Sequence, residues 1–245
     1  MNRAAIFSLG MFALLFVFAS YFNVRYGAGS QWFGKAVDDF APVKEVEFLK
    51  KYRIEGPIFN DYVIAGYLMW KLYPDYKIFI DPRCSPYMKQ VIPDYLEFTN
   101  KQVNHEDIRR FREKYPFKLV ILHYRQMGLI FDFLKAEGDE WRLLYFEKNA
   151  AILMHKSLLP IIKSEVGNVN LSPIRFSHVT NPHVLINVFN FYVRLNPEAG
   201  RYIYSVFKNN ISDYYKLKQE ILMAMDLEIK RRQEEIEYRE MWLSK

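Results

Sequence analysis

The chain has 245 residues, of which 51% are hydrophobic, 17% aromatic and 25% charged. This composition excludes a disordered, fibrous or low-complexity protein, and the length allows one or two domains with a real core. A single cysteine, Cys84, excludes an intramolecular disulfide and any zinc or iron–sulfur site that needs several cysteines. The net charge of +6 suits an anionic membrane surface and does not by itself indicate nucleic-acid binding.

The first predicted element is the uncharged segment Ala4–Phe22. As a helix it would span about 28 Å, close to the hydrocarbon thickness of a bilayer, and Tyr26 and Trp32 follow it as interface aromatics. We therefore predict a single transmembrane anchor over residues 1–25, in the cell (inner) membrane. The alternative is a cleaved signal peptide, since Val17-Phe18-Ala19 has the small-residue pattern of a cleavage site. Both alternatives place the bulk of the chain on the extracytoplasmic or periplasmic side.

After a linker over residues 26–40, residues 41–156 alternate short apolar strands with helices and close with two consecutive strands. This order predicts an α/β domain with a short, mainly parallel sheet, flanking helices and an antiparallel edge hairpin. The predicted strands cover residues 58–59, 77–81, 117–123, 141–146 and 150–155. The predicted helices cover residues 43–49, 62–72, 93–99, 105–114 and 126–136.

Polar residues follow the first two predicted strands and, with His123, the third. Ligand crevices in open α/β sheets lie beyond the carboxyl ends of the strands, so these residues are expected to gather along one edge. The predicted ligand-binding residues are Asn60, Asp61, Tyr62, Asp81 and Arg83. A structural alternative stays open, in which Asn60 and Asp61 only cap the following helix and Asp81 pairs with Arg83 or Arg125.

Prolines and a glycine in residues 157–182 indicate a connector, and residues 183–245 predict a helical region. Its first two helices, 183–195 and 198–207, are separated by Asn196-Pro197 and are expected to form an antiparallel pair.

The last predicted helix is long: it is capped by Ser212 or Asp213 and runs to about Leu243 without Gly or Pro. Its apolar residues recur every seven positions, but the neighbouring heptad row runs through Arg232 and Arg239, which argues against a self-associating coiled coil. A narrow apolar stripe is more typical of a helix that packs along a partner or its own domain. The predicted partner-binding residues are Leu222, Ile229, Ile236, Trp242 and Leu243.

One stretch of the domain resembles the exported soluble C-terminal domain of membrane glycosyltransferases of the GT-C class. The matching residues are Phe59-Asn60-Asp61-Tyr62, Gly66-Tyr67-Leu68, Trp70, Pro74, Lys77-Ile78-Phe79-Ile80-Asp81, Arg83 and Tyr87. The predicted hairpin resembles the hairpin that closes that domain, so the resemblance covers roughly residues 40–156. The chain departs from the family at Ala65 and Pro82, where the family has glycines.

The resemblance does not imply glycosyltransferase activity. Catalysis in that family relies on carboxylates in loops of a multi-span bundle and on a lipid-linked sugar held by the bundle, whereas this sequence has at most one predicted span. The five histidines lack the spacing of a metal pair, and the sequence contains no phosphate-binding loop, nucleophile elbow or zinc-protease motif. We therefore predict no catalytic residue, no cofactor and no metal.

The leading hypothesis is a non-enzymatic, single-pass membrane-anchored subunit, whose α/β domain and helical tail contact other subunits of a membrane complex. One alternative is an accessory component of a split GT-C glycosyltransferase that recognises the acceptor through Asn60, Asp61, Asp81 and Arg83. A second alternative is an independent module that binds a glycan or a lipid headgroup. The expected partners are thus the lipid bilayer, other membrane-complex subunits and a glycan, and not nucleic acid.

Overall fold

The computed structural model describes residues 40–83, 89–136, 140–158 and 173–243, together with Leu14 and Phe16. The chain divides into two compact units, Met1–Ala41 and Pro42–Lys245, and the fold belongs to the second. Within the described residues, no helix is both long and apolar enough to cross a membrane. The predicted anchor over residues 1–25 lies outside the described residues, except for Leu14 and Phe16, which are helical.

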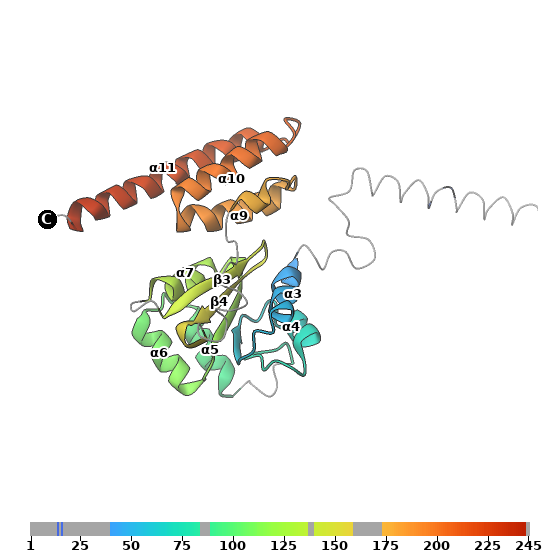
Figure 1. Cartoon of the computed structure of the whole chain (residues 1–245), viewed down its shortest axis with the longest axis vertical. Coiled ribbons are helices and arrows are strands. Elements are labelled where there is room, and N and C mark those ends of the chain that lie inside the picture. The colour runs from blue at the N-terminus through green and yellow to red at the C-terminus, as the bar shows by residue number, and fades with distance from the viewer. Residues whose placement is uncertain are drawn as a thin grey trace, which may run out of the picture. The chain divides into compact units, whose positions relative to one another are not determined.

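The sheet has four strands, β1 (Ile58–Asn60), β2 (Leu119–His123), β3 (Trp141–Phe146) and β4 (Ala150–His155), in the order β1-β2-β4-β3. β1 and β2 are parallel, whereas β4 runs antiparallel to both β2 and β3. The α/β class and the β3–β4 hairpin (Figure 1) are therefore confirmed. The prediction of a mainly parallel sheet is wrong, because only one of the three strand pairs is parallel.

The missing parallel strand is the one predicted over residues 77–81. This segment makes only an isolated parallel bridge, Ile58 to Ile78, beside β1. The Asn60 side chain occupies the place of the next ladder bonds: the N–H groups of Phe79 and Ile80 donate to its Oδ1 at 2.9 and 3.3 Å, and its Nδ2 donates to the Ile80 carbonyl at 2.9 Å. The apolar run predicted a buried, extended segment correctly, but it could not show that a side chain replaces the backbone pairing.

Helices cover both faces of the sheet, which explains why every residue of β2 is buried. On one face, Leu119 and Ile121 share a hydrophobic cluster with α3 (Val43–Lys51) and α4 (Ala65–Leu72). On the other face, Val120 and Leu122 belong to a cluster with three further helices and the helical region. These three helices are α5 (Val91–Thr99), α6 (His105–Lys114) and α7 (Met127–Lys135).

The helical region consists of α9 (Pro182–Leu195), α10 (Pro197–Asn210) and α11 (Lys218–Leu243). Asn181 and Asn196 cap α9 and α10, each followed by a proline at the first helical position, so the predicted boundary between them is confirmed. α9 packs against the hairpin through a stacked ring pair, Phe146 and Phe191, with centroids 3.9 Å apart. The helical region and the sheet therefore share one core.

The start of α11 differs from the prediction. The helix begins at Lys218 and not at a cap on Ser212 or Asp213. The buried Lys218 ammonium donates to Asp213 Oδ1 at 2.7 Å and to the Ile211 carbonyl at 2.6 Å, so Asp213 holds the turn before the helix. The structure also contains short 3-10 helices: η2 (Tyr124–Gln126), η3 (Lys156–Leu158) and η4 (Pro173–Phe176).

Gly200 allows the close approach of α10 to α9. A Cβ at this position would lie 2.8 Å from Val193 Cβ and Cγ2 and 3.0 Å from its Cα. We expect Gly200→Ala to lower the free energy of unfolding by about 1–2 kcal/mol, because the overpacking exceeds the gain in helix propensity. Denaturant unfolding measures this change.

The matched control is Gly128→Ala in α7, where an added Cβ would meet no atom within 4 Å. There only the propensity term remains, so the expected change is a stabilisation of up to about 1 kcal/mol. Equal effects of the two substitutions would contradict the packing explanation.

Candidate functional site

The strand ends hold two of the predicted ligand-binding residues in structural roles. Asp61 is fully buried: its Oδ1 accepts from the Ile64 N–H at 3.2 Å and its Oδ2 from the His123 N–H. It therefore caps the turn before α4 and joins the end of β1 to the end of β2. Burial raises the pKa of Asp61, while the N–H groups that it accepts from act in the opposite direction. Asn60, also fully buried, holds residues 79–80 as described above.

His123 lies in the same network and is fully buried. Burial, with a contribution from Arg125, lowers the pKa of His123 to about 4. The imidazole is therefore neutral at physiological pH, and its Nδ1 accepts from the Arg125 N–H at 3.4 Å. Tyr62 is 42% exposed, and its backbone N–H donates to the Tyr95 hydroxyl at 3.0 Å. The ends of β1 and β2 are thus joined by a buried hydrogen-bond network, and Tyr62 lies at its surface.

Asp81 and Arg83 form a bidentate ion pair. Arg83 Nε donates to Asp81 Oδ1 at 2.9 Å and its Nη2 donates to Oδ2 at 2.6 Å. The Asp81 side chain is only 1% exposed, whereas the Arg83 side chain is 63% exposed. Both carboxylate oxygens of Asp81 are thus engaged by a guanidinium that presents its outer side to solvent.

This ion pair lines an open groove of about 900 Å³. The groove lies between the end of α4 and the segment that follows it, and two large aromatic side chains on its border are strongly exposed: Trp70 at 67% and Tyr73 at 76%. The lining residues are Met69, Trp70, Tyr73, Pro74, Tyr76, Lys77, Ile78, Asp81 and Arg83. A concave site with mostly apolar walls and a few polar groups is the usual form of a small-ligand site.

Neighbouring side chains fix the Trp70 ring. The Lys71 ammonium lies 3.5 Å from its centroid, and the Tyr67 ring meets it edge-on at 5.9 Å. A cation over an aromatic face and an edge-to-face ring pair are both attractive, so Trp70 is held in place although it is exposed. The groove therefore has an ordered aromatic wall and, with Lys77 and Arg83, a cationic side.

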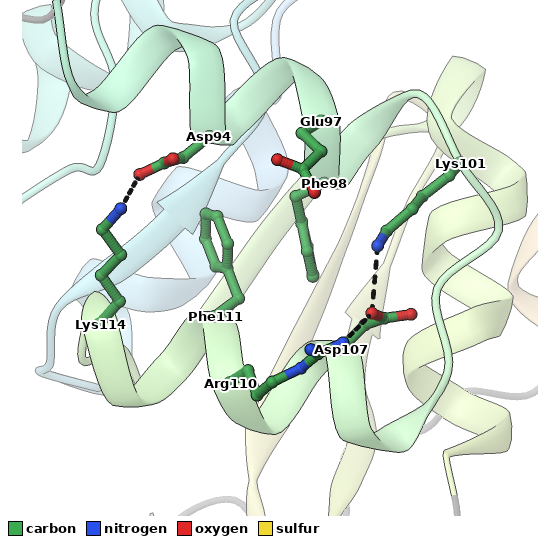
Figure 2. Close-up of a pocket in the computed structure, with 8 residues that line it drawn as sticks. All are labelled: Asp94, Glu97, Phe98, Lys101, Asp107, Arg110, Phe111 and Lys114. Carbon is green, nitrogen blue, oxygen red and sulfur yellow. Dashed lines mark hydrogen bonds and ion pairs between the residues drawn. The ribbon is translucent and has the colours of Figure 1, made fainter.

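A second pocket, between α5 and α6, has a different character (Figure 2). Its volume is about 210 Å³, which is below the range of about 300–1,000 Å³ typical of ligand sites. Three acidic and three basic side chains surround Phe98 and Phe111. Asp107 pairs with Lys101 at 3.1 Å and with Arg110 at 2.9 Å, and Asp94 pairs with Lys114. The acidic and basic groups of this pocket are equal in number and most of them pair with one another. The groove is therefore the stronger candidate for a ligand site.

The predicted partner-binding residues of the last helix do not share one environment. Leu222 and Ile229 are 7% and 2% exposed and belong to the core with α9 and α10, whereas Ile236 is 43% exposed. Trp242 and Leu243 lie in the last turn of α11, and their side chains are outside the described part of the chain. Leu222 and Ile229 therefore pack in the hydrophobic core of this chain.

The sequence reasoning did not select Trp70 and Tyr73 as site residues. The sequence signal for them was weak: Trp70 lies in the predicted helix, whereas Tyr73 follows the end of that helix, directly before Pro74. In the described part of the chain, no group of three or more His, Cys, Asp or Glu side chains could hold a metal ion.

The described residues thus form a three-layer α/β domain with an open surface groove and a helical extension. Comparisons with protein families, with curated proteins and with solved structures found no match to this chain.

Proposed function

We propose that this protein is a non-enzymatic, membrane-anchored binding subunit whose α/β domain binds a saccharide in the groove. The observation that carries the proposal is the pair of exposed aromatic rings, Trp70 and Tyr73, beside the Asp81–Arg83 ion pair. An aromatic face offers an apolar platform for the C–H face of a sugar ring. The outward guanidinium and the Lys77 ammonium are donors for its hydroxyl or acidic groups.

The chemistry of the nearby groups favours binding over catalysis. The Asp81 carboxylate is engaged on both oxygens by Arg83, Asp61 is enclosed between β1 and β2, and His123 is a buried, neutral imidazole. A general acid or base must reach the proton that it transfers, and these groups are held by the fold instead.

The test is saccharide binding by the full chain in mild detergent. An array of immobilised oligosaccharides identifies the best-bound member, and calorimetric titration then compares variants. We expect Trp70→Ala and Tyr73→Ala each to lower affinity by about tenfold, because stacking contributes about 1 kcal/mol beyond the buried area. The matched control is Tyr214→Ala, which removes a ring that is 98% exposed outside the groove. Absence of binding to the array, or equal losses for Trp70→Ala and Tyr214→Ala, would overturn the proposal.

A second candidate function is recognition of the acceptor for a split GT-C glycosyltransferase, whose catalytic transmembrane subunit would be a separate chain. It is favoured by one observation: most of the groove wall comes from the stretch that resembles the GT-C soluble domain, including Trp70, Pro74, Ile78, Asp81 and Arg83. In this case Trp70→Ala should abolish glycan transfer in membranes that contain the catalytic subunit, while the variant chain still co-purifies with that subunit. Unchanged envelope glycans in the Trp70→Ala strain would exclude this role and leave simple binding.

The membrane anchor and the extracytoplasmic location are part of the proposal and rest on the uncharged segment Ala4–Phe22. Reporter fusions at Lys245 test the location, since an active cytoplasmic reporter there would contradict it.

A further inference from the structure

Helix α11 has one buried side and one exposed side. Leu222, Met225 and Ile229 are at most 7% exposed and pack in the core, whereas Leu227 is 69% exposed and Tyr238 is 59% exposed. At about 100° per residue, Leu227 and Tyr238 lie opposite Ile229 on the helix. Figure 1 shows that α11 also runs past the end of α10.

We define the outer face of α11 by six residues in chain order: Leu227, Lys230, Arg231, Glu234, Glu235 and Tyr238. The side chains of Lys230, Arg231 and Glu235 are 65%, 54% and 41% exposed, and Glu234 is exposed. Along the helix, the residues of this face are first apolar, then basic, then acidic and finally apolar again.

This order becomes complementary to itself when the helix is reversed. In an antiparallel pair of α11 helices with the two-fold axis between residues 232 and 233, Leu227 lies opposite Tyr238. In the same register, Lys230 lies opposite Glu235 and Arg231 lies opposite Glu234. A two-fold interface requires this property, because each residue meets its counterpart in both directions.

We propose that the outer face of α11 is a homodimerisation surface that pairs antiparallel with the same face of a second copy of this chain. This inference goes beyond the saccharide-binding proposal and does not depend on it. It also differs from a heptad coiled coil, because it uses the side of the helix opposite the buried stripe.

The surrounding residues fit this arrangement. Met223, which is 74% exposed, and Met241, which is 48% exposed, extend the apolar ends of the outer face. The basic residues now bind acidic residues of their own helix, Lys230 with Asp226 at 2.8 Å and Arg231 with Glu228 at 2.8 Å. Glu235 likewise binds Arg232 of its own helix at 2.8 Å. Each of these i, i+3 or i, i+4 pairs has at least one exposed partner and contributes little free energy, so the pairs rearrange readily when a second helix approaches.

The expected dimer is concentration-dependent. Residues 223–241 span about 27 Å, and one helix face of this length buries less than the roughly 800 Å² per partner of a standard interface. Sedimentation of the full chain in mild detergent over a wide concentration range should therefore show a reversible monomer–dimer equilibrium. A chain that remains monomeric at the highest concentration overturns the proposal.

Charge reversal tests the surface itself. The double variants Lys230→Glu/Arg231→Glu and Glu234→Lys/Glu235→Lys each place like charges opposite one another, so each alone should self-associate at least about tenfold more weakly. An equimolar mixture should form a heterodimer, because an all-acidic face then meets an all-basic face. Restored association in the mixture is a result that a merely destabilised fold would not give.

Two controls complete the test. Lys50→Glu/Lys51→Glu makes the same charge change at an exposed pair on α3 and should leave dimerisation unchanged. For orientation, in a Cys84→Ser background, a mixture of Leu227→Cys and Tyr238→Cys chains should form a disulfide-linked heterodimer on oxidation, whereas Leu227→Cys alone should not. Self-linking of Leu227→Cys indicates parallel pairing, and dimerisation that survives both charge reversals indicates another interface; either result overturns the proposal.

Discussion

Phe59→Ala is expected to lower the free energy of unfolding by about 3–5 kcal/mol, the range for removing a large aromatic side chain from a core. Phe59 is fully buried in β1, and six other aromatic rings surround it with centroids 5.2–6.3 Å away. These rings come from α5, α6, α7, the segment after α4 and Phe117, which lies just before β2. The substitution therefore leaves a cavity where these elements meet, and denaturant unfolding followed by circular dichroism measures the loss.

Because domains are stable by only about 5–15 kcal/mol, Phe59→Ala will leave little margin for folding. Phe59→Leu keeps most of the volume and should cost less than half as much, so the pair gives a graded series. Tyr214→Ala, in contrast, removes an aromatic ring that is 98% exposed and should change stability by less than about 0.5 kcal/mol. A Phe59→Ala chain as stable as Tyr214→Ala would contradict the assignment of this residue to the core centre.

The sequence predicted those parts of the fold in which local signals agree. α6 begins after Asn104, whose side chain and that of Asp107 form a reciprocal capping box, and its bounds match the prediction. β3 and β4 match as well, because two apolar runs flank a three-residue polar turn, Glu147-Lys148-Asn149. In these segments, pattern, cap and turn residues all indicate the same boundaries.

The sequence failed where one side chain decides between two structures. Residues 77–81 have the composition of a central strand, but the Asn60 amide makes the bonds that a neighbouring strand would make. The candidate site shows the same limit. Asp81 and Arg83 were selected as polar residues after a strand, yet the exposed partners beside them, Trp70 and Tyr73, could not be distinguished from core aromatics without the fold.

Glu45 carries a buried carboxyl group, which the sequence did not predict. Glu45 lies in the first turn of α3 and is 1% exposed, and its Oε1 accepts from the N–H groups of Glu147 and Ala150 at 3.3 Å each. Burial, with a contribution from the Glu147 carboxylate, raises the pKa of Glu45 from 4.5 to about 7. The neighbouring Glu147 carboxylate has its own partners: Arg175 Nη1 lies 3.5 Å from its Oε2, and the Tyr145 hydroxyl donates to the same oxygen at 2.8 Å.

This shift makes Glu45 a source of pH-dependent instability. Below pH 4.5 the carboxyl is protonated in both the folded and the unfolded chain, so it has no effect. Between pH 4.5 and about 7 the unfolded chain releases a proton that the folded chain retains, and stability falls as pH rises. Above this window the loss is constant, at about 3 kcal/mol for a shift of this size.

Glu45→Gln should therefore be more stable than the original chain by about 3 kcal/mol at pH 8 and equally stable at pH 4. Its amide oxygen still accepts from Glu147 and Ala150, and no charge has to be buried at the end of the β3–β4 turn. Denaturant midpoints over this pH range provide the measurement. The matched control is Glu47→Gln on the same helix, where the side chain is 60% exposed and bound to Lys44 at 2.9 Å; it should change stability by less than about 0.5 kcal/mol at either pH. If Glu45→Gln instead lowers stability at pH 8, the carboxylate is stabilised by its hydrogen bonds more than it is penalised by burial, and the pH dependence must have the opposite sign.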